Sequence, residues 1–371
     1  MPIQRAKPRF TEVKDVSNIT ADQLSIGQIG GRRNMVINGA MQVAQRGTSS
    51  TGVGAADGYF TVDRWYSNTN GNSAGRLTMT QTAITDLPEF QNCLKFACTT
   101  ADTSIAAAER FMLEYKIEGQ DVQGLAKGTS SAKPVTVSFY VKGHDSATYT
   151  VGLYEGTTGR KIAATFPVTT SWVKQTVTFP GDTSGVIPNN NTAQLHLRFY
   201  LHGGSNYTSG TFGTSWNGDG NTVQISSSGN SIFESTSATF FLTGVQMEVG
   251  SQATEFEHRS FGEELQLCKR YFQYQTDGYR AGNGSGSNRI VVGVPLSVGM
   301  RATPATPANL SIHRSGNTTA TASIGSIFFN SGVASSTIND FLSVRFDGIS
   351  ASDEVAYSVN FNADLVLDSE L

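Results

Sequence analysis

The sequence predicts an all-β protein, and three observations support this fold class. Charged residues make up only 15% of the 371 residues, against about 25% in typical soluble domains. Glycine, a turn-forming residue, occurs 39 times. Two segments, Pro134–Lys142 and Ala193–Leu201, alternate apolar and polar side chains over the length of a strand. Because many short strands with turns between them are typical of two-layer β structures, we expect a jelly-roll β-sandwich.

The first 33 residues form an extended, polar N-terminal leader. This segment cannot bury enough apolar surface to fold alone. Its apolar residues nevertheless recur as though they were to be buried: Phe10, Val13, Val16, Ile19, Leu24, Ile26 and Ile29. Two interpretations remain open, a disordered tail and a segment that becomes ordered against a partner.

Residues 34–258 are expected to form the sandwich. Besides the two alternating segments, further strands are predicted at Leu77–Gln81, Cys93–Cys98, Arg110–Ile117, Tyr149–Tyr154, Trp172–Phe179 and Ala238–Val249. Asn38 and Gly39 predict a turn or bulge after the apolar Met35–Ile37. Trp65 is expected in the core, with Asp63 and Arg64 paired at a strand edge.

Residues 259–275 are expected to form a helical connector. Ser260 and Glu263 have the spacing of a capping box, in which each side chain bonds the backbone amide of the other residue. Leu265, Cys268 and either Tyr271 or Phe272 then fall on one stripe, so the pattern predicts a helix of about 12 residues. Residues 276–371 return to short strands and predict a smaller C-terminal β domain, with strands at 289–294, 310–313, 341–346 and 356–367.

Composition excludes several classes of partner. The chain has 27 basic and 30 acidic residues and a net charge of -3, so it lacks the basic surplus that binds nucleic acid. No apolar run reaches the ~20 residues of a membrane span, and the N-terminus has no secretory signal. We therefore expect no nucleic-acid partner, no membrane insertion and synthesis in a cytoplasm.

The sequence offers no catalytic motif. The five histidines are scattered, and none lies in an HxxxH pattern or beside a GxSxG turn. His196, on the outward face of an alternating strand, is interpreted as a solvated histidine. The glycine-rich run 282–288 has no phosphate-binding signature and is interpreted as a flexible loop. We expect no enzyme, although a pair of carboxylates suited to glycoside hydrolysis could be present.

One long polar loop, residues 203–230, contains the candidate binding residues. Its aromatic side chains either pack onto the sandwich or form a stacking surface for a sugar ring or a neighbouring subunit. Nearby amides and carboxylates could bond sugar hydroxyls. The candidate glycan-binding set is Trp216, Tyr207, Phe212, Asn217 and Asp219.

Four motifs resemble tailed-bacteriophage fibre and tail-associated proteins. They occur at Asn34–Gly47, Tyr59–Trp65, Phe240–Gly250 and Thr254–Phe272. Proteins of that kind carry a jelly-roll module similar to carbohydrate-binding modules, followed by a small β tip. The resemblance implies such a module at 34–258, a tip domain at 276–371 and a leader that anchors the protein to other virion proteins.

The resemblance also implies a function. It implies a virion protein of the tail-fibre or tail-tip type that forms a homotrimer. Several weak sites on this trimer would together bind host surface polysaccharide or lipopolysaccharide. Two alternatives remain, a decoration protein of capsid or tail with a purely structural role and a glycan-degrading tail enzyme.

No cofactor is expected, with calcium as the one alternative. Related sugar-binding jelly rolls hold calcium between their first and last strands, where Asn38 and Glu248 could supply oxygens here. Two oxygens fall short of the 6–8 that calcium takes.

Overall fold

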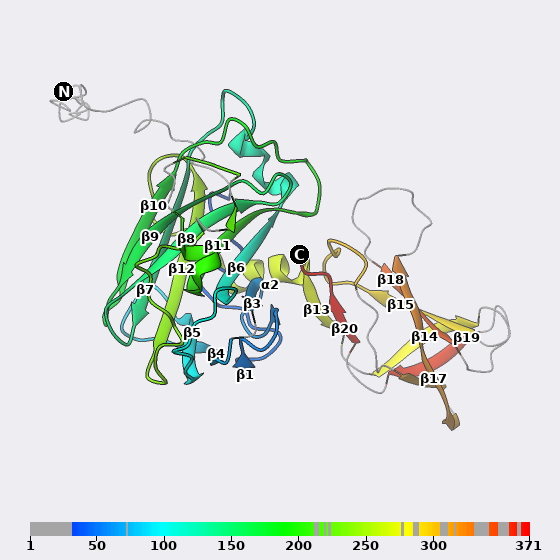
Figure 1. The fold of residues 1–371 in the computed structure, drawn as a ribbon. Coiled ribbons are helices and arrows are strands. Elements are labelled where there is room, and N and C mark those ends of the chain that lie inside the picture. Colours follow the sequence, from blue (N-terminus) through cyan, green and yellow to red (C-terminus); the bar gives the residue numbers. More distant parts are fainter. Residues whose placement is uncertain are drawn as a thin grey trace, which may run out of the picture.

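The computed structural model describes residues 32–71, 73–210, 215–218, 220–221, 224–275, 278–284, 289–304, 311–314, 317–329, 341–347, 356–361 and 365–371. The interpretation of the leader, apart from Arg32 and Arg33, lies outside these residues. The described chain forms a large β-sandwich and a smaller β-barrel, with the short helix α2 (Phe261–Lys269) between them in sequence (Figure 1). The predicted all-β class, with a jelly-roll sandwich followed by a helix and smaller C-terminal β elements, is confirmed.

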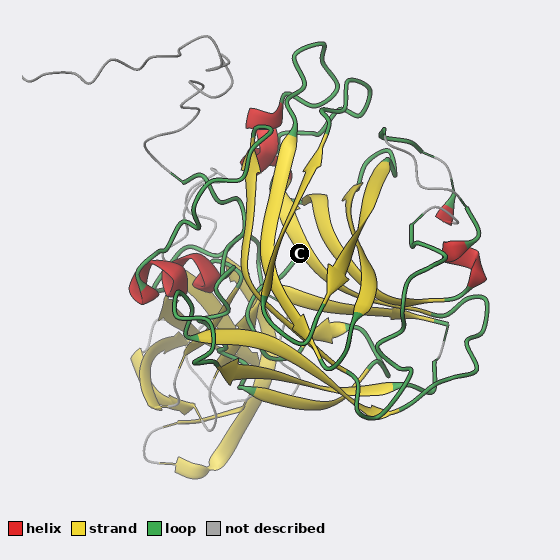
Figure 2. Cartoon of the chain, turned by 90° about the vertical axis from the view of Figure 1, so that its left-hand side faces the viewer, coloured by secondary structure: helices red, strands yellow, loops and turns green. Residues whose placement is uncertain are grey.

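The sandwich consists of two antiparallel sheets of six strands each (Figure 2). Sheet A has the strand order β1 (Ser49–Val53), β4 (Arg76–Ala83), β5 (Asn92–Thr100), β12 (Thr239–Val249), β7 (Val135–Gly143) and β10 (Val173–Phe179). Sheet B has the order β2 (Gly58–Tyr59), β3 (Trp65–Asn70), β6 (Arg110–Glu118), β11 (Ala193–Gly203), β8 (Ala147–Glu155) and β9 (Lys161–Val168). All eight strands predicted in this region are present, and β1, β2, β3 and β9 are additional.

The core lies between the inner faces of the two sheets. The alternating segments supply much of it, because every second side chain of a strand points inward. The buried set includes Val135, Val137, Phe139 and Val141 from β7 and Leu195, Leu197, Phe199 and Leu201 from β11. The rings of Phe139 and Phe199 meet edge to face, with centroids 5.0 Å apart. Aromatic contacts of this kind join sheet A to sheet B.

Asn38 and Gly39 form the predicted turn, and the structure shows why glycine is needed. The backbone amide of Val245 donates to the Gly39 carbonyl over 2.9 Å. A Cβ atom at Gly39 would lie 2.1 Å from the Val245 carbonyl oxygen, which is closer than any real contact. The turn therefore packs directly on the backbone of β12.

Trp65 is fully buried, as predicted, but the expected pairing of Asp63 with Arg64 is wrong. Asp63 instead accepts hydrogen bonds from the backbone and side chain of Gln45. Arg64 adopts a left-handed backbone conformation with φ of 75° and points to Glu370, near the end of the chain. The two adjacent side chains thus bind different partners, although Arg46 contacts both Asp63 and Glu370.

The described part of the chain contains three short helices, η1 (Gly119–Leu125), α1 (Ser205–Thr208) and α2 (Phe261–Lys269). The Ser260 half of the predicted capping box is present, because its hydroxyl accepts from the Glu263 amide at 3.3 Å. The Glu263 side chain pairs with Arg32 instead. At nine residues the helix is shorter than predicted. Tyr271 and Phe272 follow it, and Phe272 begins a strand instead. Among the described residues, no helix has the length and apolar character needed to cross a membrane.

The C-terminal part is a closed barrel carried on a two-stranded ribbon. The ribbon pairs β13 (Phe272–Gln275) with β20 (Leu365–Asp368). The barrel has the order β14 (Gly278–Gly284), β15 (Arg289–Pro295), β18 (Phe341–Asp347), β17 (Asn317–Phe329), β16 (Ser311–Arg314) and β19 (Ala356–Phe361). The loop predicted for residues 282–288 is wrong in part, because 282–284 belong to β14 and pair with β15 and β19. A Cβ atom at Gly282 would lie 2.7 Å from Ile290 Cγ2, so glycine permits the close packing there.

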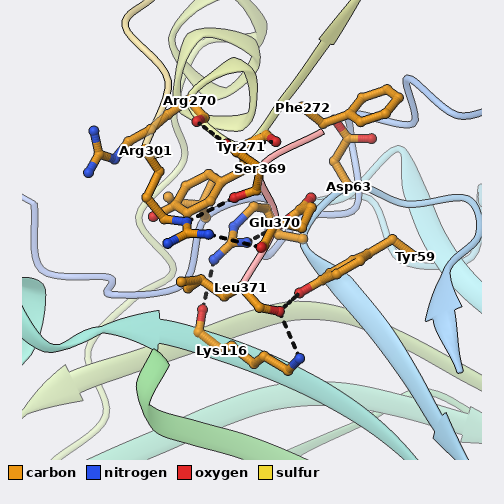
Figure 3. A network of polar contacts seen from close by, with 12 residues as sticks. Tyr59, Asp63, Lys116, Arg270, Tyr271, Phe272, Arg301, Ser369, Glu370 and Leu371 are labelled. Atoms are coloured by element: carbon orange, nitrogen blue, oxygen red, sulfur yellow. Dashed lines mark hydrogen bonds and ion pairs between the residues drawn. The ribbon is translucent and has the colours of Figure 1, made fainter. Parts of the chain in front are cut away.

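The ribbon returns the end of the chain to the sandwich, where a polar network holds it (Figure 3). Glu370 forms ion pairs with Arg64 and Arg46. The backbone carbonyl of Leu371 accepts from Lys116 at 2.7 Å and from the Tyr59 hydroxyl at 3.0 Å. The last described residues therefore lie against the outer face of sheet B.

Candidate functional site

Trp216, the central residue of the predicted glycan site, packs onto the sandwich. Its side chain is only 8% exposed, and its indole nitrogen donates to the Pro180 carbonyl at 2.7 Å. The Lys127 ammonium lies 4.0 Å from the ring centroid and binds Asp182. With one face covered by a lysine and the edge bonded to the backbone, the ring favours the packing alternative over sugar stacking.

The other described members of the predicted set are also engaged within the protein. Tyr207 is 5% exposed and accepts a hydrogen bond from the Asn70 side chain at 2.6 Å. The backbone of Asn217 forms an isolated bridge with Lys161. Phe212 and Asp219 lie outside the described residues. The structure therefore does not bring the described members together on an open surface.

Neither predicted calcium ligand is free. Asn38 is fully buried, and its side chain bonds the backbone of Val43 in both directions as well as the Asp63 carbonyl. Glu248 accepts from the backbone and hydroxyl of Thr254, each at 2.8 Å. Both side chains hold loops in place, and the described residues contain no cluster of three or more potential metal-binding side chains.

One histidine lies between a serine and a carboxylate, an arrangement that the sequence did not reveal. His202 is bonded through Nδ1 to the Ser231 hydroxyl at 2.8 Å and through Nε2 to Glu109 at 3.3 Å. The His202 side chain is fully buried, and the Ser231 oxygen already accepts from the Phe233 amide. This cluster therefore joins β11 to the following loop and leaves no exposed nucleophile.

The outer face of sheet B brings together a different set of polar and aromatic residues. Strand register places Tyr66, Glu114 and Arg198 in one row across β3, β6 and β11. The adjacent row contains Lys116, His196 and Tyr154 from β6, β11 and β8. We call these residues the sheet B face: Tyr66, Glu114, Lys116, Tyr154, His196 and Arg198.

Glu114 organises the centre of the sheet B face. Its Oε1 atom lies 2.8 Å from His196 Nδ1 and accepts from Arg198 Nε at 2.6 Å. Burial alone would raise the pKa of this carboxyl, but the His196 hydrogen bond and the Arg198 charge lower it to about 2. Glu114 is therefore ionised at neutral pH, and it orients both partners across two neighbouring strands.

His196 is held as a neutral acceptor. Burial lowers the pKa of its imidazole more than Glu114 raises it. Because the Glu114 carboxylate can only accept, Nδ1 must carry the proton that bonds it, which leaves Nε2 as a hydrogen-bond acceptor. The interpretation of His196 as a solvated histidine is thus wrong, since only 12% of its side chain is exposed.

Two half-buried tyrosines flank this polar centre. The Arg198 guanidinium lies 3.9 Å from the centroid of Tyr154, and the Lys116 ammonium lies 3.9 Å from the centroid of Tyr66. Such contacts fix the orientation of both rings. Burial raises the pKa of Tyr66 to about 12, so its hydroxyl remains a donor.

The sheet B face therefore combines aromatic rings with donors and acceptors whose positions are set before any ligand binds. Aromatic faces suit the apolar faces of sugar rings. The side chains of Glu114 and Arg198 are only 2% and 10% exposed, so the half-buried tyrosines are the most accessible part of this face. Because apolar and polar residues alternate along Ala193–Leu201, the outward direction of His196 and Arg198 could be recognised from the sequence. The partners Glu114 and Tyr154 required the strand pairing.

Comparisons with known proteins found distant structural matches. No family model matches the chain, and no curated protein matches it. Solved structures similar to it include the enzymatically active domain of tailspike protein 4 of bacteriophage CBA120, at 10% identity and a TM-score of 0.31, covering 58% of this chain and 21% of that chain. A family 11 carbohydrate-binding module from Clostridium thermocellum, in complex with a beta-1,3-1,4-mixed-linked tetrasaccharide, matches at 13% identity and a TM-score of 0.29, covering 56% and 98%. A cyclase from Fischerella sp. TAU matches at 12% identity and a TM-score of 0.33, covering 60% and 100%.

Proposed function

We propose that the protein is a non-enzymatic virion protein of the bacteriophage tail-fibre or tail-tip type that binds host surface glycan through the sheet B face. The observation that carries the proposal is the Glu114 centre, which holds His196 and Arg198 between Tyr66 and Tyr154. The four sequence motifs support the assignment to a phage tail protein. Host polysaccharide or lipopolysaccharide is the proposed ligand.

Glycan binding at this face would depend on how the aromatic and polar side chains are oriented, and it would involve no reaction of the sugar. Each tyrosine can present to a pyranose the ring face that its cation leaves uncovered. The accessible edges of Arg198 and His196, 10% and 12% exposed, would bond sugar hydroxyls. Because these groups are already ordered, little side-chain entropy is lost when a sugar binds. Several such sites on a trimeric fibre would raise avidity by about 100 to 10,000-fold without a tight single site.

The virion role predicts where the leader and the sandwich would lie on the phage particle. The leader would attach the fibre to other virion proteins, and the sandwich would face the host. Antibody labelling of intact particles should place the sandwich at the periphery of the tail. Labelling on the capsid or along the tail tube would favour the decoration-protein alternative.

The glycan role is tested by replacing the flanking tyrosines. Binding of full-length protein to a panel of purified bacterial surface polysaccharides and lipopolysaccharides should weaken by ~1–3 kcal/mol in Tyr66→Ala and in Tyr154→Ala, on the scale of aromatic stacking. Tyr274→Ala is the matched control, because Tyr274 is 39% exposed and lies on the ribbon. Unchanged binding in both face variants, or no binding by the parent protein, would contradict the proposal. Release of reducing sugar from a bound polymer would favour the enzyme alternative.

A further inference from the structure

A row of alternating lysine and aromatic side chains crosses the outer face of sheet A. Register pairs Phe241 of β12 with Lys95 of β5 on one side and with Lys142 of β7 on the other. Trp172 comes directly before Val173, which pairs with Val141, so Trp172 lies beside Lys142. The row therefore reads Lys95, Phe241, Lys142, Trp172, and we call it the cation–aromatic row.

Each side chain lies against its neighbour in the row. The Lys95 ammonium lies 5.3 Å from the Phe241 centroid, and the Lys142 ammonium lies 5.0 Å from the centroids of both Phe241 and Trp172. The two aromatic rings meet edge to face at 6.2 Å. Each ammonium thus lies near a ring that could also contact a ligand.

The row faces away from the core and from the sheet B face. Phe240 and Leu242, the neighbours of Phe241 on β12, are completely buried between the sheets. Because successive side chains of a strand point to opposite sides, Phe241 points outward, and it is half-buried. The cation–aromatic row is therefore on the opposite side of the sandwich from Tyr66 and Tyr154.

Asp86 orders one end of the row. Its carboxylate accepts from the Trp172 indole nitrogen at 2.9 Å and from the Lys142 ammonium at 2.5 Å. A third lysine, Lys174, lies 5.8 Å from the Tyr140 ring on the same face. Within the described part of the chain, neither Lys95 nor Lys174 forms an ion pair with a carboxylate. The Tyr140 hydroxyl donates to Glu89 on this face at 3.4 Å, so Lys95 and Lys174 are the two ammonium groups left to meet an anionic ligand.

We propose that the cation–aromatic row binds an anionic polysaccharide, a polymer whose sugars carry carboxylate or phosphate groups. The rings would stack on sugar faces while the ammonium groups between them pair with the acidic substituents. Adjacent strands are about 4.8 Å apart, so the row extends about 14 Å and suits an extended polymer better than a single ion. This site is additional to the sheet B face and extends the proposed glycan-binding function to a charged class of sugar.

Charge argues against a second copy of the chain as the occupant. A two-fold contact through this face would place the same patch of each subunit opposite the other. Lys95 and Lys174, which form no ion pair with a carboxylate in the described part of the chain, would both be taken out of water at such a contact, which is unfavourable. An acidic polymer instead supplies the complementary charge.

The test measures binding of the full-length protein to polygalacturonate, which carries carboxylates, to phosphorylated mannan and to neutral dextran. The variant Lys95→Gln/Lys142→Gln should weaken binding to the acidic polymers about tenfold, from the loss of two charge contacts. Added salt should weaken parental binding in the same way. Lys133→Gln/Lys269→Gln makes the same change in net charge elsewhere and should bind like the parent, whereas Lys95→Arg/Lys142→Arg should retain binding.

The outcomes separate this inference from the proposed function. If the double glutamine variant loses binding only to polygalacturonate, carboxylate is the recognised group; if it loses binding only to phosphorylated mannan, phosphate is. Either result supports the inference. Equal binding by the double glutamine variant and the parent, or no parental binding to either acidic polymer, overturns it. A change in oligomeric mass of the variant, with acidic-polymer binding intact, would overturn it in favour of a contact between copies. Tyr154→Ala leaves the cation–aromatic row intact, so its effect tests the sheet B face alone.

Discussion

The guanidinium of Arg64 and the carboxylate of Glu370 form a buried ion pair that joins the start of β3 to the end of the chain. The two side chains are 0% and 4% exposed. Arg64 also donates to the Lys116 carbonyl at 2.7 Å and stacks on Tyr271 at 3.4 Å. The pair therefore connects the sandwich, the segment after α2 and the ribbon.

Replacing one member of this pair should be costly. Glu370→Gln leaves the Arg64 charge buried without its partner, so the free energy of unfolding should fall by about 3 kcal/mol. Urea unfolding followed by tryptophan fluorescence would measure the loss. Arg289→Gln is the control, because its ion pair with Asp347 is 55% and 41% exposed and should contribute less than about 1 kcal/mol. Equal losses of unfolding free energy in the two variants would show that burial does not determine how much an ion pair contributes to stability.

Glu114 should make stability depend on pH in the acidic range. Its pKa in the folded protein is about 2, below the usual value near 4.3. The stability that ionised Glu114 contributes is therefore fully present above the pKa that this carboxyl has in the unfolded chain. It is lost as the pH falls from about 4.5 to about 2, through the pKa in the folded protein. The linked stability is at most about 3 kcal/mol. Denaturant midpoints measured across this range should show a shallower decline in Glu114→Gln, and parallel curves would contradict the assignment.

Trp216 should behave as a core residue. Trp216→Ala removes a ring that fills the space beside Leu153 and Leu195, and the expected loss of stability is about 3–5 kcal/mol. Trp216→Phe keeps most of the packing but loses the hydrogen bond to Pro180, so its loss should be smaller. Thermal unfolding would distinguish these effects. A normal melting temperature in Trp216→Ala, combined with loss of glycan binding, would restore the stacking alternative.

Gly39 should be intolerant of any side chain. The backbone of Val245 occupies the space that a Cβ would need, so Gly39→Ala should destabilise the sandwich by about 1–3 kcal/mol. Gly262 lies in the first turn of α2, and a methyl group there would have open space, with no atom within 4 Å, so Gly262→Ala should be neutral or slightly stabilising. Comparison of the two melting temperatures checks this prediction. Similar effects would show that the close approach to β12 can relax.

Local sequence patterns predicted much of the fold. Strict alternation located two of the eight predicted sandwich strands, β7 and β11, and the Ser260 cap located the start of α2, because both signals depend on neighbours a few residues apart. Predictions failed where small or polar residues hide a strand. The glycine-rich β14 lacks an apolar pattern of its own, and pairing with β15 and β19 defines it instead.

The candidate site divides in the same way. Alternation along the strand predicted that His196 points outward, and the nature of the side chain predicted that Trp65 lies in the core. Only tertiary structure brought Glu114 beside His196 and Arg198, and placed Phe241 between Lys95 and Lys142, because the register of paired strands depends on residues far apart in sequence. It also decided that Trp216 packs inward and that Glu370 meets Arg64. The sequence by itself therefore determined which side of a strand each residue occupies, while the long-range packing of strands and loops determined which residues meet there.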